Sequence, residues 1–179
     1  MKVSKEQVAN HREAILQAAG RLFRERGFDG VTVAEIMKEA GLTHGAFYGY
    51  FPSKEALIAE AAERALVPAP EPAPADAYAD LYLSVAHRDN RANGCVFASL
   101  GTEAVRGSDD LRHRMTQSVR RQIERFSAEA KGRTAHERRR AAIAAWSSMI
   151  GAVMLARIVD DEALSQEILN ETRAALPFD

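Results

Sequence analysis

The residues most suited to chemistry with another molecule lie close together in the N-terminal third of the chain. His44, Tyr48 and Tyr50 carry hydrogen-bonding groups, and the positions between them include glycine and alanine. Hydrogen-bonding side chains on a surface of low relief suit contact with the phosphates and base edges of DNA. Phe47 and Phe51 are four residues apart, which is the spacing of one helix face. The segment therefore indicates a surface helix that contacts nucleic acid.

Two short helices joined by a glycine turn would position these side chains. Thr32 and Glu35 have the spacing of a capping box, which predicts the start of the first helix. Gly41 permits a tight corner, and Thr43 can cap the second helix. This order predicts a helix-turn-helix over about 32–51, whose second helix enters the DNA major groove. The alternative is a helical hairpin that packs only against its own domain.

Residues 28–57 resemble the DNA-binding domain of TetR-family transcriptional regulators, and the match extends over roughly 11–65. The resemblance implies that His44 and its neighbours lie on a recognition helix, and that Thr32 and Lys54 touch phosphate. Base reading is expected chiefly from His44, because the start of the preceding helix is apolar. The predicted DNA-contacting residues are Thr32, Val33, Thr43, His44, Gly45, Ala46, Tyr48, Tyr50 and Lys54.

The sequence lacks the common motifs for catalysis and metal binding. It has no Gly-x-Ser-x-Gly elbow, no phosphate-binding glycine loop and no His-Glu-x-x-His. Its five histidines include no pair at a metal-ligand spacing such as i, i+4. The single cysteine, Cys95, excludes an intramolecular disulfide and a multi-thiolate zinc site. We therefore expect neither an enzyme nor a metal or other cofactor.

Composition predicts an ordinary globular protein of the cytoplasm. The 179 residues are 46% hydrophobic and 27% charged, which excludes disordered and fibrous classes. The longest stretch without a charged residue, 141–156, is shorter than the roughly 20 residues that a membrane span needs. Charged residues at positions 2–13 leave no room for the apolar core of a signal peptide. A single cysteine is also typical of a reducing compartment.

Net charge taken alone argues against a nucleic-acid partner. The chain has 24 basic and 25 acidic residues, and its formal charge is −1. The proposed DNA-binding domain, 1–66, is also balanced. DNA binding must then depend on a few groups placed on one face. We expect limited non-specific affinity and a shallow salt dependence.

Apolar periodicity predicts an all-α fold of about nine helices. An N-terminal helix-turn-helix domain of three helices, 1–66, is followed by a proline-rich connector, 67–75. A helical ligand-binding and dimerisation domain, 76–179, completes the chain. Further capping boxes begin at Ser4 and Thr134. The expected helices cover about 4–26, 32–40, 44–50, 54–66, 75–87, 95–106, 109–131, 135–159 and 161–175.

The helix over 135–159 is expected to pair with a second copy of the chain. It is apolar around most of its circumference, which favours a core on one face and a partner on the other. A two-fold DNA reader needs recognition helices one DNA turn apart, roughly 34–36 Å. TetR-like proteins usually dimerise through their last two long helices. The alternative is a core entirely within one chain. The expected interface residues are Ala145, Ala152, Ala156, Leu164 and Ile168.

The C-terminal domain is expected to hold a cavity for a small effector. Segment 93–100 resembles the Gly-Cys segment that opens the sixth helix in one large TetR subgroup, which places Cys95 beside the cavity. Cys95 is interpreted either as a redox sensor or as a small buried hydrophobe. The expected lining consists of Tyr82, Cys95, Phe97, Met115, Trp146 and Met149, with plain core packing as the alternative for each.

These expectations combine into one functional prediction. The chain is expected to be a ligand-responsive transcriptional repressor that binds a palindromic operator in double-stranded DNA as a homodimer. A small, largely apolar effector would release it from DNA. The alternative is a helical protein-interaction adaptor without DNA binding. An adaptor gives no reason for His44, Tyr48, Tyr50 and Lys54 to occur together.

Overall fold

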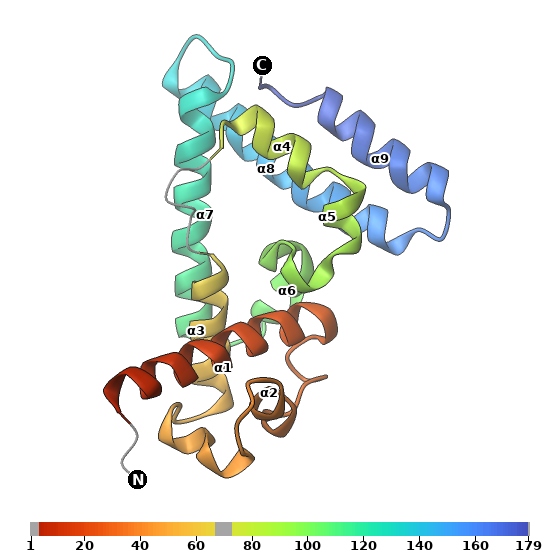
Figure 1. Cartoon of the computed structure of the whole chain (residues 1–179). Coiled ribbons are helices and arrows are strands. Elements are labelled where there is room, and N and C mark those ends of the chain that lie inside the picture. Colours follow the sequence, from red (N-terminus) through yellow and green to blue (C-terminus); the bar gives the residue numbers. More distant parts are fainter. Residues whose placement is uncertain (1–3, 67–72, 179) are drawn as a thin grey trace.

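The computed structural model describes residues 4–66 and 73–178, and every regular element in these ranges is a helix (Figure 1). The predicted all-α fold is confirmed. The α-helices are α1 (Lys5–Arg26), α2 (Val33–Glu39), α3 (Lys54–Ala65), α4 (Ala75–Tyr82), α5 (Val85–Asp89), α6 (Val96–Ala104), α7 (Asp109–Glu129), α8 (Ala135–Ile158) and α9 (Glu162–Ala174). Two 3-10 helices, η1 (His44–Gly49) and η2 (Arg91–Asn93), lie between them.

Three helices begin at the predicted capping boxes. The side chains of Ser4, Thr32 and Thr134 each accept a hydrogen bond from the backbone amide three residues later. The Gln or Glu at that later position accepts one in return from the amide of the capping residue. These bonds satisfy amides that the helix itself leaves without partners. The starts of α1, α2 and α8 are therefore fixed by local sequence, and the prediction is confirmed.

Two predicted helices differ from the observed ones. The second helix of the helix-turn-helix is the 3-10 helix η1, because Thr43 gives no side-chain cap and two of its six residues are glycines. The helix expected over 75–87 is two helices, α4 and α5. Ser84 separates them, since its Oγ accepts from the backbone N–H of His87 and caps the new helix α5.

Helix α7 joins two hydrophobic cores. The first core lies among α1, α2, η1 and α3, and it also contains Val96 and Leu100 of α6 and Leu111 of α7. The second core lies among α4, α8, α9 and the C-terminal half of α7, which contributes Phe126. Figure 1 shows α7 running from α3 at one end to the α8 region at the other. The helix-turn-helix therefore packs on the rest of the chain through α6 and α7.

The predicted domain boundaries are not tested by this packing and stay a prediction. Residues 67–72 of the proline-rich connector lie outside the described residues. Helix α4 begins at Ala75, the last position assigned to the connector, and Pro74 is its N-cap residue. Proline is tolerated there because the amides at a helix start have no partner within the helix.

Helix α8 is apolar because it is a core helix. Within the described ranges it is the one helix long and apolar enough, by length and composition, to cross a membrane. A core helix meets the same criteria, and α8 carries Trp146, Met149 and Val153 into the second core. Its hydrophobic composition therefore has an explanation within the fold.

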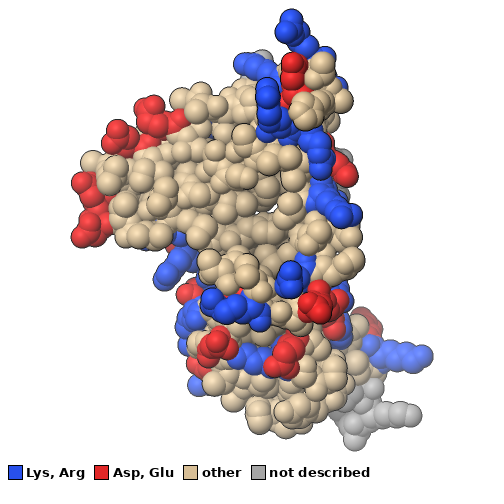
Figure 2. Space-filling model, turned by 180° about the vertical axis from the view of Figure 1, so that it is seen from behind, with Lys and Arg blue, Asp and Glu red and all other residues tan. Residues whose placement is uncertain are grey.

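Charged side chains are distributed unevenly over the surface. Figure 2 shows acidic side chains along the edge of the molecule formed by α9, and basic ones along the opposite edge. The end of the molecule formed by α2 and η1 carries few charged side chains on the face in view. This end contains the residues that the sequence assigns to DNA contact.

Candidate nucleic-acid interface and interior cavity

The turn between α2 and η1 has the geometry of a helix-turn-helix corner. Gly41 has a φ of +73°, in the left-handed region that glycine adopts without strain. The N–H of Leu42 donates to the carbonyl of Met37 over 2.8 Å and closes the end of α2. Phe47 and Phe51 are buried with their ring centroids 6.0 Å apart. These two rings anchor η1 on the first core and fix its outward face.

The outward face of η1 is exposed and has little bulk. Thr43, His44 and Gly45 are exposed, and 72% of the Tyr48 surface is accessible. A Cβ atom added at Gly45 or at Gly49 would meet no other atom within 4 Å. The fold therefore does not require glycine at either position. A surface that approaches DNA closely does benefit from small residues there.

Two predicted DNA-contacting side chains have hydrogen-bond partners within the chain. The hydroxyl of Tyr50, which is half-buried, lies 2.9 Å from Nδ1 of His11 on α1. The ammonium group of Lys54 donates to the carbonyl of Phe28 over 2.6 Å. Both bonds hold parts of the N-terminal domain together, so Tyr50 and Lys54 already have a structural role. To contact phosphate, each side chain would have to keep its hydrogen bond and share the donor, or give that bond up.

The other three predicted residues lie at the edge of the interface. Thr32 is exposed at the start of α2, and its hydroxyl donates to Glu35 over 2.7 Å. Val33 and Ala46 are half-buried against the first core, so they offer little surface. The DNA contacts of all nine residues stay predictions.

Most arginines around this interface form ion pairs with carboxylates of the same domain. A domain with equal numbers of basic and acidic residues therefore has few cations left to contact phosphate. Hydrogen bonds from Thr32 and Arg26 hold the pKa of Glu35 at about 2. Lys5 and Lys38 are exposed and form no ion pair with a described residue. The ion pairs are Arg12–Glu60, Arg21–Glu39, Arg26–Glu35 and Arg64–Glu13.

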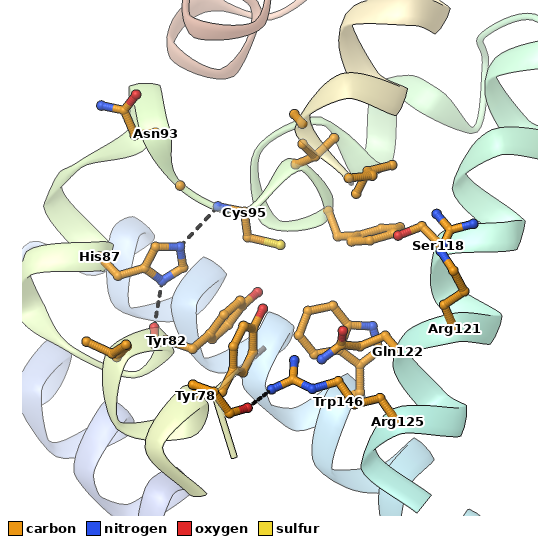
Figure 3. Close-up of a pocket in the computed structure, with 17 residues that line it drawn as sticks. Tyr78, Tyr82, His87, Asn93, Cys95, Ser118, Arg121, Gln122, Arg125 and Trp146 are labelled. Carbon is orange, nitrogen blue, oxygen red and sulfur yellow. Dashed lines mark hydrogen bonds between the residues drawn. The ribbon is translucent and has the colours of Figure 1, made fainter. Parts of the chain in front are cut away.

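A cavity of about 750 Å³ lies among α4, α5, α6, α7 and α8 (Figure 3). Trp146 of α8 is part of its wall, with its ring centroid 5.4 Å from that of Tyr82 and 6.0 Å from that of Phe97. The rings of Tyr78 and Tyr82 stack 5.7 Å apart on the α4 side. The volume is that of a site for a drug-sized molecule, and the wall includes the rings of Tyr78, Tyr82, Phe97 and Trp146.

Four of the six residues predicted for the cavity line it, and two do not. Tyr82, Cys95, Phe97 and Trp146 are in the wall. The predictions for two methionines are wrong. Met115 packs in the first core, and Met149 is fully buried in the second. Both lie on apolar helix faces, and those faces pack against other helices instead of the cavity.

Sequence analysis missed the polar part of the wall. Ser118, Arg121, Gln122 and Arg125 of α7 line the cavity together with Tyr78. The four α7 residues have helical spacing and form one polar stripe. The amphipathic pattern of α7 draws attention to its apolar stripe, and the sequence offers no sign that this polar stripe faces a cavity instead of solvent.

His87 connects the cavity wall to the start of α6. The backbone N–H of Cys95 donates to its Nε2 over 3.0 Å. Nδ1 therefore carries the proton, and it donates to the carbonyl of Tyr82 over 2.6 Å. Burial lowers the pKa of His87, because a charged imidazole would lose its hydration. The neutral ring is thus part of the folded structure.

Acidification should cost stability through His87. Since its pKa in the folded chain is below 6.5, its contribution is fully present above that value and is lost as the pH falls further. We expect a slope of up to about 1.4 kcal/mol per pH unit, the value for one proton. Denaturant unfolding at pH 7.5, 6.5 and 5.5 measures it. His87→Gln should flatten the slope and His113→Gln, at an exposed site, should not; equal slopes in all three proteins would contradict the assignment.

The cavity environment does not activate Cys95. Burial raises the pKa of its thiol, and the first amides of α6 offset only part of this. The thiol stays protonated near neutral pH and is a weak nucleophile. Within the described ranges, no three His, Cys, Asp or Glu side chains gather to hold a metal ion.

The cavity wall continues into contacts with the helix-turn-helix. Arg24 of α1 donates from Nε to the carbonyl of Ala92 over 2.6 Å, directly before the wall residues Asn93 and Cys95. At the other end of α6, Glu103 accepts from the N–H of Phe28 over 2.6 Å. Movement of α6 or of the segment before it would therefore act on α1.

The predicted dimer interface requires a correction. Ala145, Ala152 and Ala156 are buried within the same chain, at 3–4% exposure, so they offer no surface to a partner. For these residues the alternative of an intramolecular core is right. Ile168 is half-buried against the second core, whereas Leu164 is 43% exposed. The outward apolar residues of α8 are Ile143, Leu155 and Ile158, at 42%, 53% and 73% exposure.

Comparison with known proteins relates the N-terminal part of the chain to a family of regulators. Residues 15–61 match the family model described as "Bacterial regulatory proteins, tetR family". The chain is 45% identical over 60 residues to the uncharacterized HTH-type transcriptional regulator YvdT of Bacillus subtilis, covering 34% of this chain and 31% of that protein. It is 30% identical over 122 residues to the HTH-type transcriptional repressor NemR of Escherichia coli, and the match covers 61% of each. The chain thus spans about a third to three-fifths of the length of these relatives.

A solved structure extends the likeness to nearly the whole chain. The crystal structure of the reduced form of E. coli NemR covers 92% of this chain, and the match covers 93% of that protein. The TM-score is 0.67 and the sequence identity is 25%. The matched residues 15–61 are those that form the helix-turn-helix corner and its supporting core. The helix-turn-helix domain of the chain is that of the TetR family of bacterial regulatory proteins.

Proposed function

We propose that the chain is a ligand-responsive, DNA-binding transcriptional repressor of the cytoplasm, and that it is not an enzyme. It binds a palindromic operator as a homodimer, and a small, largely apolar effector releases it. One observation carries the proposal: hydrogen bonds of Arg24 and Glu103 join the N-terminal helical domain to the residue before the cavity-lining Asn93 and to the end of α6, whose first residues line the cavity. The repressor NemR, a relative over 61% of the chain, supports the direction of regulation.

The exposed face of η1 supports DNA binding through the major groove. Tyr48 is 72% exposed, and its hydroxyl is suited to donate to a phosphate oxygen. His44 is exposed one residue after the turn, where a recognition helix reaches base edges. Lys38 and Lys5 add positive charge for the backbone. The few available cations agree with the expected shallow salt dependence.

An apolar surface on the last two helices supports a homodimer. Ile143, Leu155 and Ile158 of α8 and Leu164 of α9 are all exposed in the single chain. Gly151 lies on the same helix, and a Cβ added there would meet no atom within 4 Å. Its small size allows a partner helix to approach closely. Self-complementary pairing about a two-fold axis would match a palindromic operator.

Release by the effector follows from the contacts between the cavity and α1. A ligand in the cavity contacts Asn93 and Cys95, which follow the Ala92 carbonyl held by Arg24. If the ligand binds one arrangement of this segment better, it shifts the population toward that arrangement. The two recognition helices then lose the spacing that the operator requires.

Selection of bound DNA from a random library tests the proposed function against the adaptor alternative. The full chain should enrich a palindrome whose half-sites are separated by about one helical turn. Enrichment of no sequence, with the protein folded and dimeric, would favour the adaptor. A direct repeat would contradict the two-fold homodimer.

The variant Tyr48→Ala should bind the selected operator about 10-fold more weakly, which corresponds to the loss of roughly 1.4 kcal/mol. Tyr48 is exposed, so its truncation should leave the melting temperature within a degree or two. Fluorescence anisotropy with labelled operator measures the affinity. Tyr48→Phe serves as the matched variant, and its comparison with Tyr48→Ala separates the hydroxyl from the ring. Wild-type affinity in Tyr48→Ala would remove Tyr48 from the interface.

A further inference from the structure

The cavity wall contains three buried polar atoms that have no hydrogen-bond partner among the described residues. They are the hydroxyl of Tyr82, Nε2 of Gln122 and Nε1 of Trp146. An indole N–H can only donate, and the amide nitrogen of glutamine also donates. Leaving a buried donor unsatisfied costs roughly 1–3 kcal/mol, and protein interiors contain few such groups. Three in one cavity indicate a ligand that accepts hydrogen bonds.

The charges of the wall exclude one class of ligand. Arg121 and Arg125 line the cavity, whereas no Asp or Glu is among the described residues that line it. Arg125 donates to the carbonyl of Ala73 and lies 4.8 Å above the ring of Tyr78. Burial raises the pKa of Tyr82 and of Cys95, so neither supplies a negative charge near neutral pH. A cationic ligand would find two positive groups and no counter-charge.

The shape of the wall selects flat molecules. Tyr78, Tyr82, Phe97 and Trp146 line the space, and Figure 3 shows the tyrosines on one side, the α7 side chains on the other, and Trp146 between them. Aromatic walls favour a planar partner, because rings stack face to face or meet edge to face. The side chains of α7 that line the cavity, Gln122 among them, place polar groups next to these aromatic rings.

We propose that the effector of this repressor is a planar aromatic molecule, neutral or anionic, with a carbonyl or carboxylate oxygen that accepts hydrogen bonds from Trp146 Nε1 and Gln122 Nε2. That this ligand acts as an effector rests on the proposed function, whereas the preference for this class of ligand rests on the cavity alone. Aromatic acids and aromatic amides share this chemistry. Cationic aromatics and plain aromatic hydrocarbons do not.

Four probes with the same ring system test the preference: 2-naphthoate, 2-naphthamide, 2-naphthylmethylammonium and 2-ethylnaphthalene. Isothermal titration of the full chain should give at least about 10-fold tighter binding of the two acceptors than of the cation and the hydrocarbon. Trp146 is the single tryptophan of the chain, so quenching of its fluorescence locates the bound probe in the cavity. Equal or tighter binding of the cation, binding without quenching, or binding of no probe would overturn the proposal.

Two substitutions at Gln122 separate donation from packing. Gln122→Glu replaces the donor by a negative acceptor of the same shape, and it should weaken 2-naphthoate by at least about 30-fold while strengthening the ammonium probe. Gln122→Leu should weaken both acceptors about 5- to 10-fold and leave 2-ethylnaphthalene unchanged. A purely structural role would change all four probes alike, and that result would overturn the proposal. The titrations contain no DNA, so their outcome does not depend on whether an operator is found. If the probes do not show the expected preference, the test of DNA binding is likewise unaffected.

Discussion

The variant Gly45→Leu should lose DNA binding while keeping its fold. A Cβ at Gly45 meets no atom of the chain, so the added side chain projects into the space in front of η1. In a complex that space is occupied by DNA, and the leucine would hold the recognition helix away from bases and phosphates together. We expect the affinity for the operator to fall by at least about 100-fold, or roughly 2.8 kcal/mol. Fluorescence anisotropy measures the affinity, and thermal unfolding measures the stability.

Gly101→Leu is the matched control for this experiment. Gly101 lies on α6, and a Cβ there also meets no atom within 4 Å. Both variants therefore replace an unhindered helical glycine by leucine and add the same apolar side chain. Only Gly45→Leu places that side chain on η1. Near-wild-type binding by Gly45→Leu, with both proteins folded, would show that another face of the domain contacts DNA.

The variant Leu155→Glu should convert the dimer into monomers and abolish operator binding as a consequence. Leu155 is 53% exposed in the single chain, so a charge there is solvated in the monomer and buried without a partner in the dimer. In the proposed two-fold interface, each substitution places two carboxylates in the contact. Light scattering coupled to size exclusion at micromolar concentration should show a mass near 19.6 kDa, the mass of one chain. Operator affinity should fall by at least about 100-fold, since each half-site then binds alone.

Val105→Glu controls for the addition of charge to an exposed apolar site. Val105 is 74% exposed at the end of α6, away from α8 and α9. It should remain dimeric and bind the operator normally. A dimeric Leu155→Glu, or a Val105→Glu that becomes monomeric, would place the interface elsewhere on the chain.

Local signals explain why the helix-turn-helix was predictable from sequence. The capping box at Thr32, the glycine at the corner and the four-residue spacing of Phe47 and Phe51 each act within one or two turns of chain. Their effects are independent of the rest of the fold. What the sequence did not predict was the 3-10 geometry of η1, because propensity and capping are both weak there.

The cavity was harder to predict because its wall comes from many separate helices. Trp146 and Tyr82 follow from their aromatic character, whereas Met115 and Met149 have the same apolar character and lie in the cores. Which side of α7 faces the space is decided by how α7 packs against α4 and α8. Gln122 therefore enters the wall through tertiary packing, and no local pattern distinguishes it from a solvated glutamine.

Helix α8 illustrates the same limit for interfaces. Ala145, Met149, Ala152 and Ala156 have the spacing of one helix face, and that pattern is correct. The spacing of apolar residues identifies the buried face of a helix, but it does not say whether that face packs on the same chain or on another one. Small residues suggested a partner helix from another chain, and the partners proved to be helices of the same chain.

The first core has a consequence for exchanging modules between regulators. Because Val96, Leu100 and Leu111 complete the core around α1 and α3, a hybrid joined at the proline-rich connector would separate that core from part of its own packing. The unit to transplant is therefore discontinuous: residues 4–66 together with α6 and the first turns of α7. The hydrogen bond between Phe28 and Glu103 would stay inside this unit, whereas the one between Arg24 and Ala92 would cross its edge and would have to be rebuilt with the new cavity domain.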